Sequence, residues 1–117
     1  GIEYDQLRDR TQGETSIEIK NRVESAREIQ RQRFGKSATH TNARMTSAQV
    51  NKFCTLSVDC ENLLKKAFER LNLSARASTR ILKVARTIAD IEGCADIGIN
   101  HLSEAIQYRS LDRKYNV

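Results

Sequence analysis

The chain has 117 residues and a formal net charge of +5, from 20 lysines and arginines against 15 acidic residues. This length fits one domain or a piece of a larger protein, and the mild basic excess permits a polyanionic partner without requiring one. Mean hydropathy is -0.61, and no run of residues approaches the roughly 18 apolar residues of a membrane helix, which excludes a membrane-spanning class. The absence of proline favours an all-α fold. The three cysteines, odd in number and without framework spacing, favour a reducing compartment, so we expect a cytoplasmic protein.

The first helix is expected from about Ser16 to about Phe34. Residues 1–13 show no clear period, and a capping-box pattern, Thr15 to Glu18, follows them, so residues 1–15 are interpreted as a connector. The apolar stripe of this helix is narrow and ends in a polar residue, so the helix is expected to be charge-rich and only partly buried. Its members are Ile19, Val23, Ala26 and Gln30. The polar segment 35–44 is interpreted as a mobile surface loop.

Two shorter helices are predicted next. Thr46 or Ser47 caps a helix that ends near Phe53, and Ser57 caps a second helix over about 58–72. The second helix has an apolar face with helical spacing, which predicts that it packs on the core. This face consists of Cys60, Leu64, Ala67, Phe68 and Leu71.

The longest amphipathic helix is predicted between Ser74, a good N-cap residue, and Gly93, which fits the position just after the C-terminus. Its apolar stripe consists of Ala77, Ile81, Val84, Ala85, Ile88 and Ile91. The opposite, solvent-facing side is expected to carry Arg76, Arg80, Lys83, Thr87 and Asp90, with Arg86 beside them. A last helix is expected from Asn100, its cap, to about Arg109, followed by a fraying tail. The fold class is therefore predicted to be all-α, a bundle of four to five helices over residues 16–117 with the 74–93 helix at its centre.

The familiar catalytic and metal-binding motifs are absent from the sequence. The tripeptide Gly35-Lys36-Ser37 suggests a phosphate-binding loop, but that motif requires a glycine where Gln30 stands and a preceding strand rather than a helix. There is no C-x-x-C or H-x-x-x-H pair, so no metal site is predicted. Neither His40 nor His101 has a nucleophile or carboxylate at a catalytic spacing. We therefore predict no self-contained active site.

Arg76 is the most informative candidate for binding. It falls in the first turn of a capped helix, where free backbone N–H groups and the helix dipole favour an anion. A guanidinium there adds a charged fork for phosphate oxygens, and Arg80 and Lys83 follow on the same side. The alternative interpretation of these three residues is a solvated basic face.

Nearly the whole chain resembles the C-terminal helical region of magnesium-chelatase-like AAA+ ATPases, in the branch of the competence protein ComM. The ordered set of motifs is specific, although each element alone is weak. The central stretch is LSARASTRILKVARTIADIEG, residues 73–93. The other elements are Gly13-Glu14-Thr15-Ser16, Arg22-Val23, Ala26-Arg27-Glu28-Ile29-Gln30, Arg33-Phe34, Asn42-Ala43, His101-Leu102, Glu104-Ala105-Ile106, Tyr108-Arg109 and Leu111-Asp112-Arg113. Ser78 departs from the family pattern, which has an aromatic residue at this place.

The resemblance implies that this chain is the α-helical lid that follows a nucleotide-binding core, and that residues 1–15 connect it to that core. It implies that Arg76 is the sensor-2 arginine, which reaches the terminal phosphates of ATP. Arg80, Lys83 and Arg86 are candidate helpers of Arg76, but no firm family role transfers to them. The expected cofactor is ATP with Mg²⁺ in the parent protein, with none bound to this chain alone. The expected partners are the upstream core, DNA in the full-length protein, and further copies of the protein in a hexameric ring that acts as a branch-migration helicase.

Two other functions stay open at this point. The chain is alternatively a free-standing nucleic-acid-binding module, against which the low aromatic content of 5% counts. It is alternatively a subunit-assembly surface, formed by the charged faces of its first and central helices. Neither alternative is enzymatic.

Overall fold

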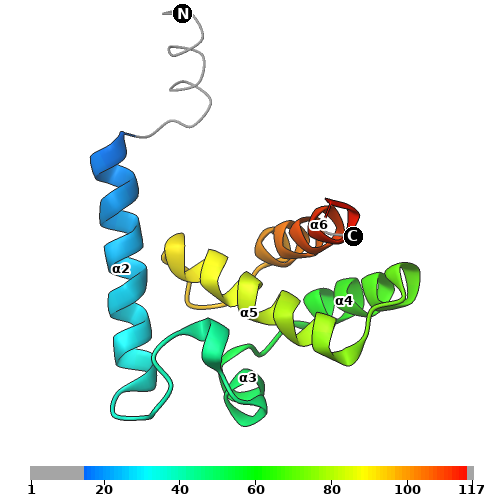
Figure 1. Cartoon of the computed structure of the whole chain (residues 1–117), viewed down its shortest axis with the longest axis horizontal. Coiled ribbons are helices and arrows are strands. Elements are labelled where there is room, and N and C mark those ends of the chain that lie inside the picture. Colours follow the sequence, from blue (N-terminus) through cyan, green and yellow to red (C-terminus); the bar gives the residue numbers. More distant parts are fainter. Residues whose placement is uncertain (1–14, 116–117) are drawn as a thin grey trace, which may run out of the picture.

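The computed structural model describes residues 15–115, with side chains to Arg109 (Figure 1). Within this range the chain forms five α-helices and one 3₁₀ turn and has no strand, which confirms the all-α prediction. The elements are α2 (Ser16–Phe34), η1 (Asn42–Arg44), α3 (Ser47–Phe53), α4 (Val58–Leu71), α5 (Ala75–Ile91) and α6 (Ile99–Tyr115). Apart from Thr15, the expected connector lies outside the described residues. No helix of the described range is long and apolar enough to cross a bilayer.

The starts of four helices follow from their capping residues, as the sequence predicts. Thr15 and Thr46 each close a complete capping box, the first with Glu18 and the second with Gln49. The hydroxyl groups of Ser57 and Ser74 accept backbone N–H groups at the starts of α4 and α5. Each cap stabilises its helix by about 1 kcal/mol, and this local chemistry fixes where the chain enters each helix.

α5 is the central element of the fold (Figure 1). It contacts α2, η1, α3 and α6, while α4 packs mainly on α6. The core between α5 and α6 is nearly closed to solvent, with Ile81 and Leu102 almost fully buried and small alanines that allow close packing. Gly93 ends α5 with a φ of 74°, as its predicted position requires, because only glycine adopts this conformation without strain.

α2 stands beside the C-terminal end of α5 and is buried only in its second half (Figure 1). Ala26 and Phe34 are buried, whereas Ile17 is 72% exposed. The ring of Phe34 packs edge-on against Phe53 of α3 at a centroid distance of 5.8 Å. This agrees with the predicted partly buried, charge-rich helix.

The segment 35–44 is an irregular segment with most of its residues exposed, as the prediction of a surface loop requires, but two of its residues are buried. Thr39 and Asn42 are buried, and residues 42–44 form the turn η1. The backbone N–H of Asn42 donates to Gln30 Oε1 at 2.9 Å, and the Thr39 hydroxyl donates to Gln49 Oε1 at 2.9 Å. The prediction missed the burial of these two residues because polar composition does not reveal partners on α2 and α3.

The predicted bounds of α6 were also wrong. The helix begins at Ile99 rather than after an Asn100 cap, and it runs to Tyr115 rather than ending near Arg109. At its start the backbone N–H of Gly98 donates to His101 Nδ1 at 2.8 Å. A histidine side chain therefore satisfies the donor that a capping-box glutamate usually covers, which a search for common caps does not find.

Candidate functional site

Arg76 lies at the N-terminal end of α5, remote from α2 (Figure 1). The Ser74 hydroxyl accepts the N–H of Ala77 at 3.1 Å, and the Ser74 carbonyl accepts the N–H of Ser78 at 3.0 Å. Within the described chain, the N–H groups of Ala75 and Arg76 have no acceptor. The first turn also carries no acidic residue, so this helix terminus presents positive charge to the surface.

The side chain of Arg76 is exposed and makes no hydrogen bond or ion pair with any residue of the described range. Because a guanidinium remains charged at any physiological pH, this arginine is an unneutralised cation beside free backbone donors. The arrangement is chemically suited to a phosphate or another oxyanion from outside the described chain.

Arg80 and Lys83 follow Arg76 along the same side of α5. Their Cα atoms lie about 6 Å and 10 Å further along the helix axis. Arg80 is exposed and borders a small crevice with Tyr108 of α6. Lys83 is half-buried, and its Nζ donates to the carbonyl oxygen of Ala43 at 3.2 Å. The three residues therefore share a side, but their surroundings differ.

Arg86 and Asp90 do not lie on the solvent-facing side, which corrects the prediction from helical periodicity. Arg86 is 4% exposed and Asp90 is 1% exposed. Arg86 Nε and Nη2 lie 3.1 Å and 3.0 Å from Asp90 Oδ1. Arg86 also donates to the carbonyl oxygens of Cys94 and Ala95, at 2.8 Å and 2.9 Å. The pair is buried because each charge meets its opposite and its remaining groups are hydrogen-bonded.

A second arginine, from α2, completes this buried cluster. Arg33 donates two parallel hydrogen bonds to the Asp90 carboxylate, from Nη1 to Oδ2 and from Nη2 to Oδ1, each 2.7 Å long. Asn42 Nδ2 donates to Asp90 Oδ2 at 2.8 Å, and its Oδ1 accepts from Arg33 Nη1 at 2.8 Å. We call Arg33, Asn42, Arg86 and Asp90 the Asp90 cluster. It fastens α2 and η1 onto the second half of α5.

The electrostatics of the Asp90 cluster depend on its two cations. Burial alone raises the pKa of Asp90, but hydrogen bonds from Arg33 and Asn42, together with the two guanidinium charges, hold the pKa below its usual value. Both guanidinium groups are bound to the Asp90 carboxylate, so neither is an unpaired cation like that of Arg76. We therefore assign it to the architecture, although it contains residues that carry the family resemblance.

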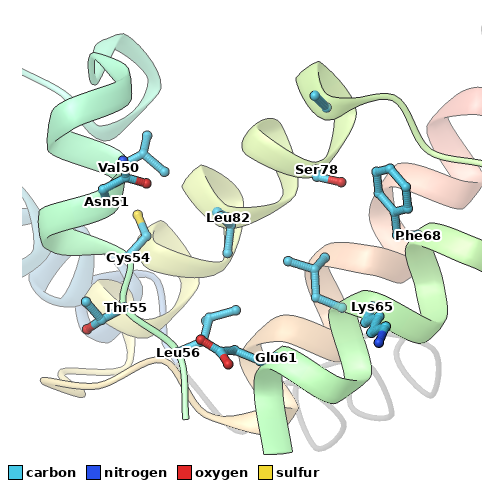
Figure 2. A pocket seen from close by; sticks show the side chains of 12 residues that line it. Val50, Asn51, Cys54, Thr55, Leu56, Glu61, Lys65, Phe68, Ser78 and Leu82 are labelled. Atoms are coloured by element: carbon cyan, nitrogen blue, oxygen red, sulfur yellow. The ribbon is translucent and has the colours of Figure 1, made fainter. Parts of the chain in front are cut away.

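A groove of about 730 Å³ lies between α3, α4 and α5, on a different face of α5 from Arg76, Arg80 and Lys83 (Figure 2). Leu64 and Phe68 line it from α4, and Ser78 and Leu82 line it from α5. Phe68 is 43% exposed here, so it does not join the core as its place on the apolar stripe predicts. The Ser78 hydroxyl is buried without a partner among the described residues.

The other candidates for catalytic chemistry among the described residues are the two histidines and the buried Cys54. His101 is buried, and its Nε2 lies 3.2 Å from Glu92 Oε2. The spacing of these two residues in the sequence did not predict this contact. His40 is exposed on the segment after α2. Cys54 is buried, and burial raises the pKa of its thiol although nearby arginines partly oppose this. In residues 15–109 no three His, Cys, Asp or Glu side chains gather closely enough to hold a metal ion.

Comparison with known proteins agrees with these observations. The family described as magnesium chelatase, subunit ChlI C-terminal, matches residues 13–109. The chain is 44% identical to the uncharacterized protein YifB of Salmonella typhimurium over 103 residues, 88% of this chain and 20% of that protein. It is 44% identical to the competence protein ComM of Haemophilus influenzae over 101 residues, 86% of this chain and 19% of that protein.

A more distant relative is the uncharacterized protein Rv2897c of Mycobacterium tuberculosis, which is 31% identical over 97 residues, 83% of this chain and 19% of that protein. The chain thus spans about a fifth of the length of the curated relatives it matches. No solved structure matches it.

Proposed function

The chain belongs to the family of C-terminal domains of magnesium chelatase subunit ChlI, and on that premise we propose that it is the helical lid of an AAA+ ATPase. The relatives extend well beyond the length of this chain, which leaves room for an upstream nucleotide-binding core. ATP with Mg²⁺ would be held mainly by that core, so the lid alone is expected to bind ATP weakly.

Arg76 is proposed to be the sensor-2 arginine, which meets the terminal phosphates of the bound ATP. The observation that supports this role is the exposed guanidinium of Arg76, unpaired within the described chain, beside the free N–H groups at the start of α5. Preorganised donors of this kind stabilise the charge that develops on phosphate oxygens during transfer. Since α5 is the central helix, a change in the phosphates at its end would also shift the orientation of the whole lid.

The parent protein is further proposed to couple ATP hydrolysis to DNA remodelling or branch migration, as a ring of identical subunits in the cytoplasm. The family resemblance supports this proposal, as does the similarity to the competence protein ComM of Haemophilus influenzae. No feature of the described residues supports chelatase chemistry, so we do not propose it.

The experiment is ATP turnover by the full-length protein with Arg76→Ala. We expect the turnover number to fall at least about tenfold, since removal of a charged donor from a transferring phosphoryl group costs about 1.4 kcal/mol or more. The matched control is Arg70→Ala, which removes an exposed arginine from the last turn of α4. Wild-type turnover in Arg76→Ala, with native helicity, would exclude the sensor-2 role.

A further inference from the structure

The solvent-facing side of α5 is basic over the first half of the helix. Its cations are Arg76, Arg80 and Lys83, and the single acidic residue of the helix, Asp90, is buried and paired. Arg80 makes no hydrogen bond or ion pair with the described part of the chain. Lys83 uses one N–H on the Ala43 carbonyl, which leaves two donors of its ammonium group for another acceptor. This side therefore has unused capacity to bind anionic oxygens.

An exposed aromatic ring lies next to these cations. Tyr108 of α6 is 62% exposed and borders a small crevice together with Arg80 and Val84. The same ring and the same Val84 also border a larger hollow of about 400 Å³. The hollow is lined by Ala43, Lys83, Val84, Thr87, Ile88, Glu104 and Tyr108. A flat apolar group placed there would have the tyrosine ring on one side and Lys83 at its edge, and it would lie next to the crevice that Arg80 borders.

We propose that this basic and aromatic face, formed by Arg80, Lys83, Glu104 and Tyr108, binds single-stranded DNA. One base stacks on Tyr108 within the hollow, and the neighbouring phosphates lie on Arg80 and Lys83. Stacking platforms flanked by basic side chains are the usual means by which proteins hold single strands. The inference rests on the proposed function only in the choice of DNA as the nucleic acid.

Glu104 is expected to make the proposed DNA-binding face bind some bases more tightly than others. It is an exposed carboxylate at the hollow and is not ion-paired within the described residues. A carboxylate accepts a hydrogen bond from the exocyclic amino group of cytosine, whereas thymine offers a carbonyl oxygen and a methyl group at the corresponding edge. The face is therefore expected to bind cytosine-containing strands more tightly than thymine strands.

This face is separate from the proposed ATP site. Lys83 lies about 10 Å along the axis from Arg76, so a nucleotide at the start of α5 and a strand at the hollow do not need the same atoms. The DNA test therefore uses no nucleotide, and its failure would leave the role of Arg76 in ATP turnover unaffected.

The test is anisotropy titration of the 117-residue chain with labelled oligo(dC) and oligo(dT) of about 12 nucleotides, at about 50 mM and 200 mM salt. Tyr108→Ala should weaken binding of both strands at least about fivefold. Arg80→Ala should reduce the slope of log affinity against log salt by about 0.7, the loss of one phosphate contact. Glu104→Gln should abolish the preference for oligo(dC).

Arg70→Ala is the matched control, because it removes the same charge from α4, which does not border the hollow. Circular dichroism of each variant verifies the helical fold. Equal losses in Arg70→Ala and Arg80→Ala, or unchanged binding in Tyr108→Ala, would overturn the proposal. Displacement of the oligonucleotide by polyglutamate at equal charge would also overturn it and would identify an acidic protein as the partner.

Discussion

Two arginines on the same helix, Arg76 and Arg86, show opposite uses of one side chain. Arg76 is exposed at the start of α5 and has no partner within the described residues, whereas Arg86 is buried near the end and bonds to Asp90 and to two carbonyl groups. Arg76 is available to a ligand, whereas the hydrogen bonds of Arg86 stabilise the fold. A positively charged position on an amphipathic helix therefore indicates a binding residue only when its surroundings leave it unpaired.

The largest expected difference between these two arginines is in the free energy of unfolding of their alanine variants. Arg86→Ala should lower the free energy of unfolding by about 3–5 kcal/mol, because it removes one of the two cations that compensate a buried carboxylate. Arg76→Ala should change it by no more than about 0.5 kcal/mol, as for other exposed residues. Urea unfolding followed by circular dichroism measures both values. Similar values for the two variants would break the comparison.

The pH dependence of unfolding tests the Asp90 cluster more finely. Because the folded state lowers the pKa of Asp90 below 3.8, this carboxylate stabilises the fold fully at pH values well above 3.8. Its contribution should be lost as the pH falls below 3.8 toward the folded-state pKa. Urea midpoints of the wild type and Asp90→Asn, measured from neutral to acidic pH, should therefore converge at the acidic end. A constant difference between them would show that the charge of Asp90 does not stabilise the cluster.

The smallest effect is expected for a third arginine, which is paired but exposed. Arg31 Nε lies 2.8 Å from Glu28 Oε2 on α2, and both side chains remain more than half exposed. Arg31→Ala should lower the free energy of unfolding by only about 0.2–0.5 kcal/mol, and added salt should reduce this difference further. A loss comparable to that of Arg86→Ala, in the same urea experiment, would mean that pairing rather than burial determines the cost.

Local chemistry made much of the fold predictable. The caps Thr15, Thr46, Ser57 and Ser74 satisfy backbone donors three residues away, so a short window of sequence contains the whole interaction. The start of α6 was missed because His101 performs this task with a ring nitrogen.

The Asp90 cluster was missed for a different reason. Arg33 and Asn42 reach Asp90 from far along the chain, and helical periodicity assigns a charged residue to solvent unless such partners are known. The position of Arg76 was predictable because a helix terminus is a local feature. The hollow beside Tyr108 was not, since it exists only where α5 meets α6 and η1.

The two short bonds between Arg33 and Asp90 also have a mechanical consequence. They join α2 to α5 through a bidentate contact, which fixes the relative orientation of the two helices more closely than a single hydrogen bond would. Because this contact lies in the C-terminal half of α5, a displacement of α2 would move α5 with it, and the opposite end of α5, at Ala75, would move furthest.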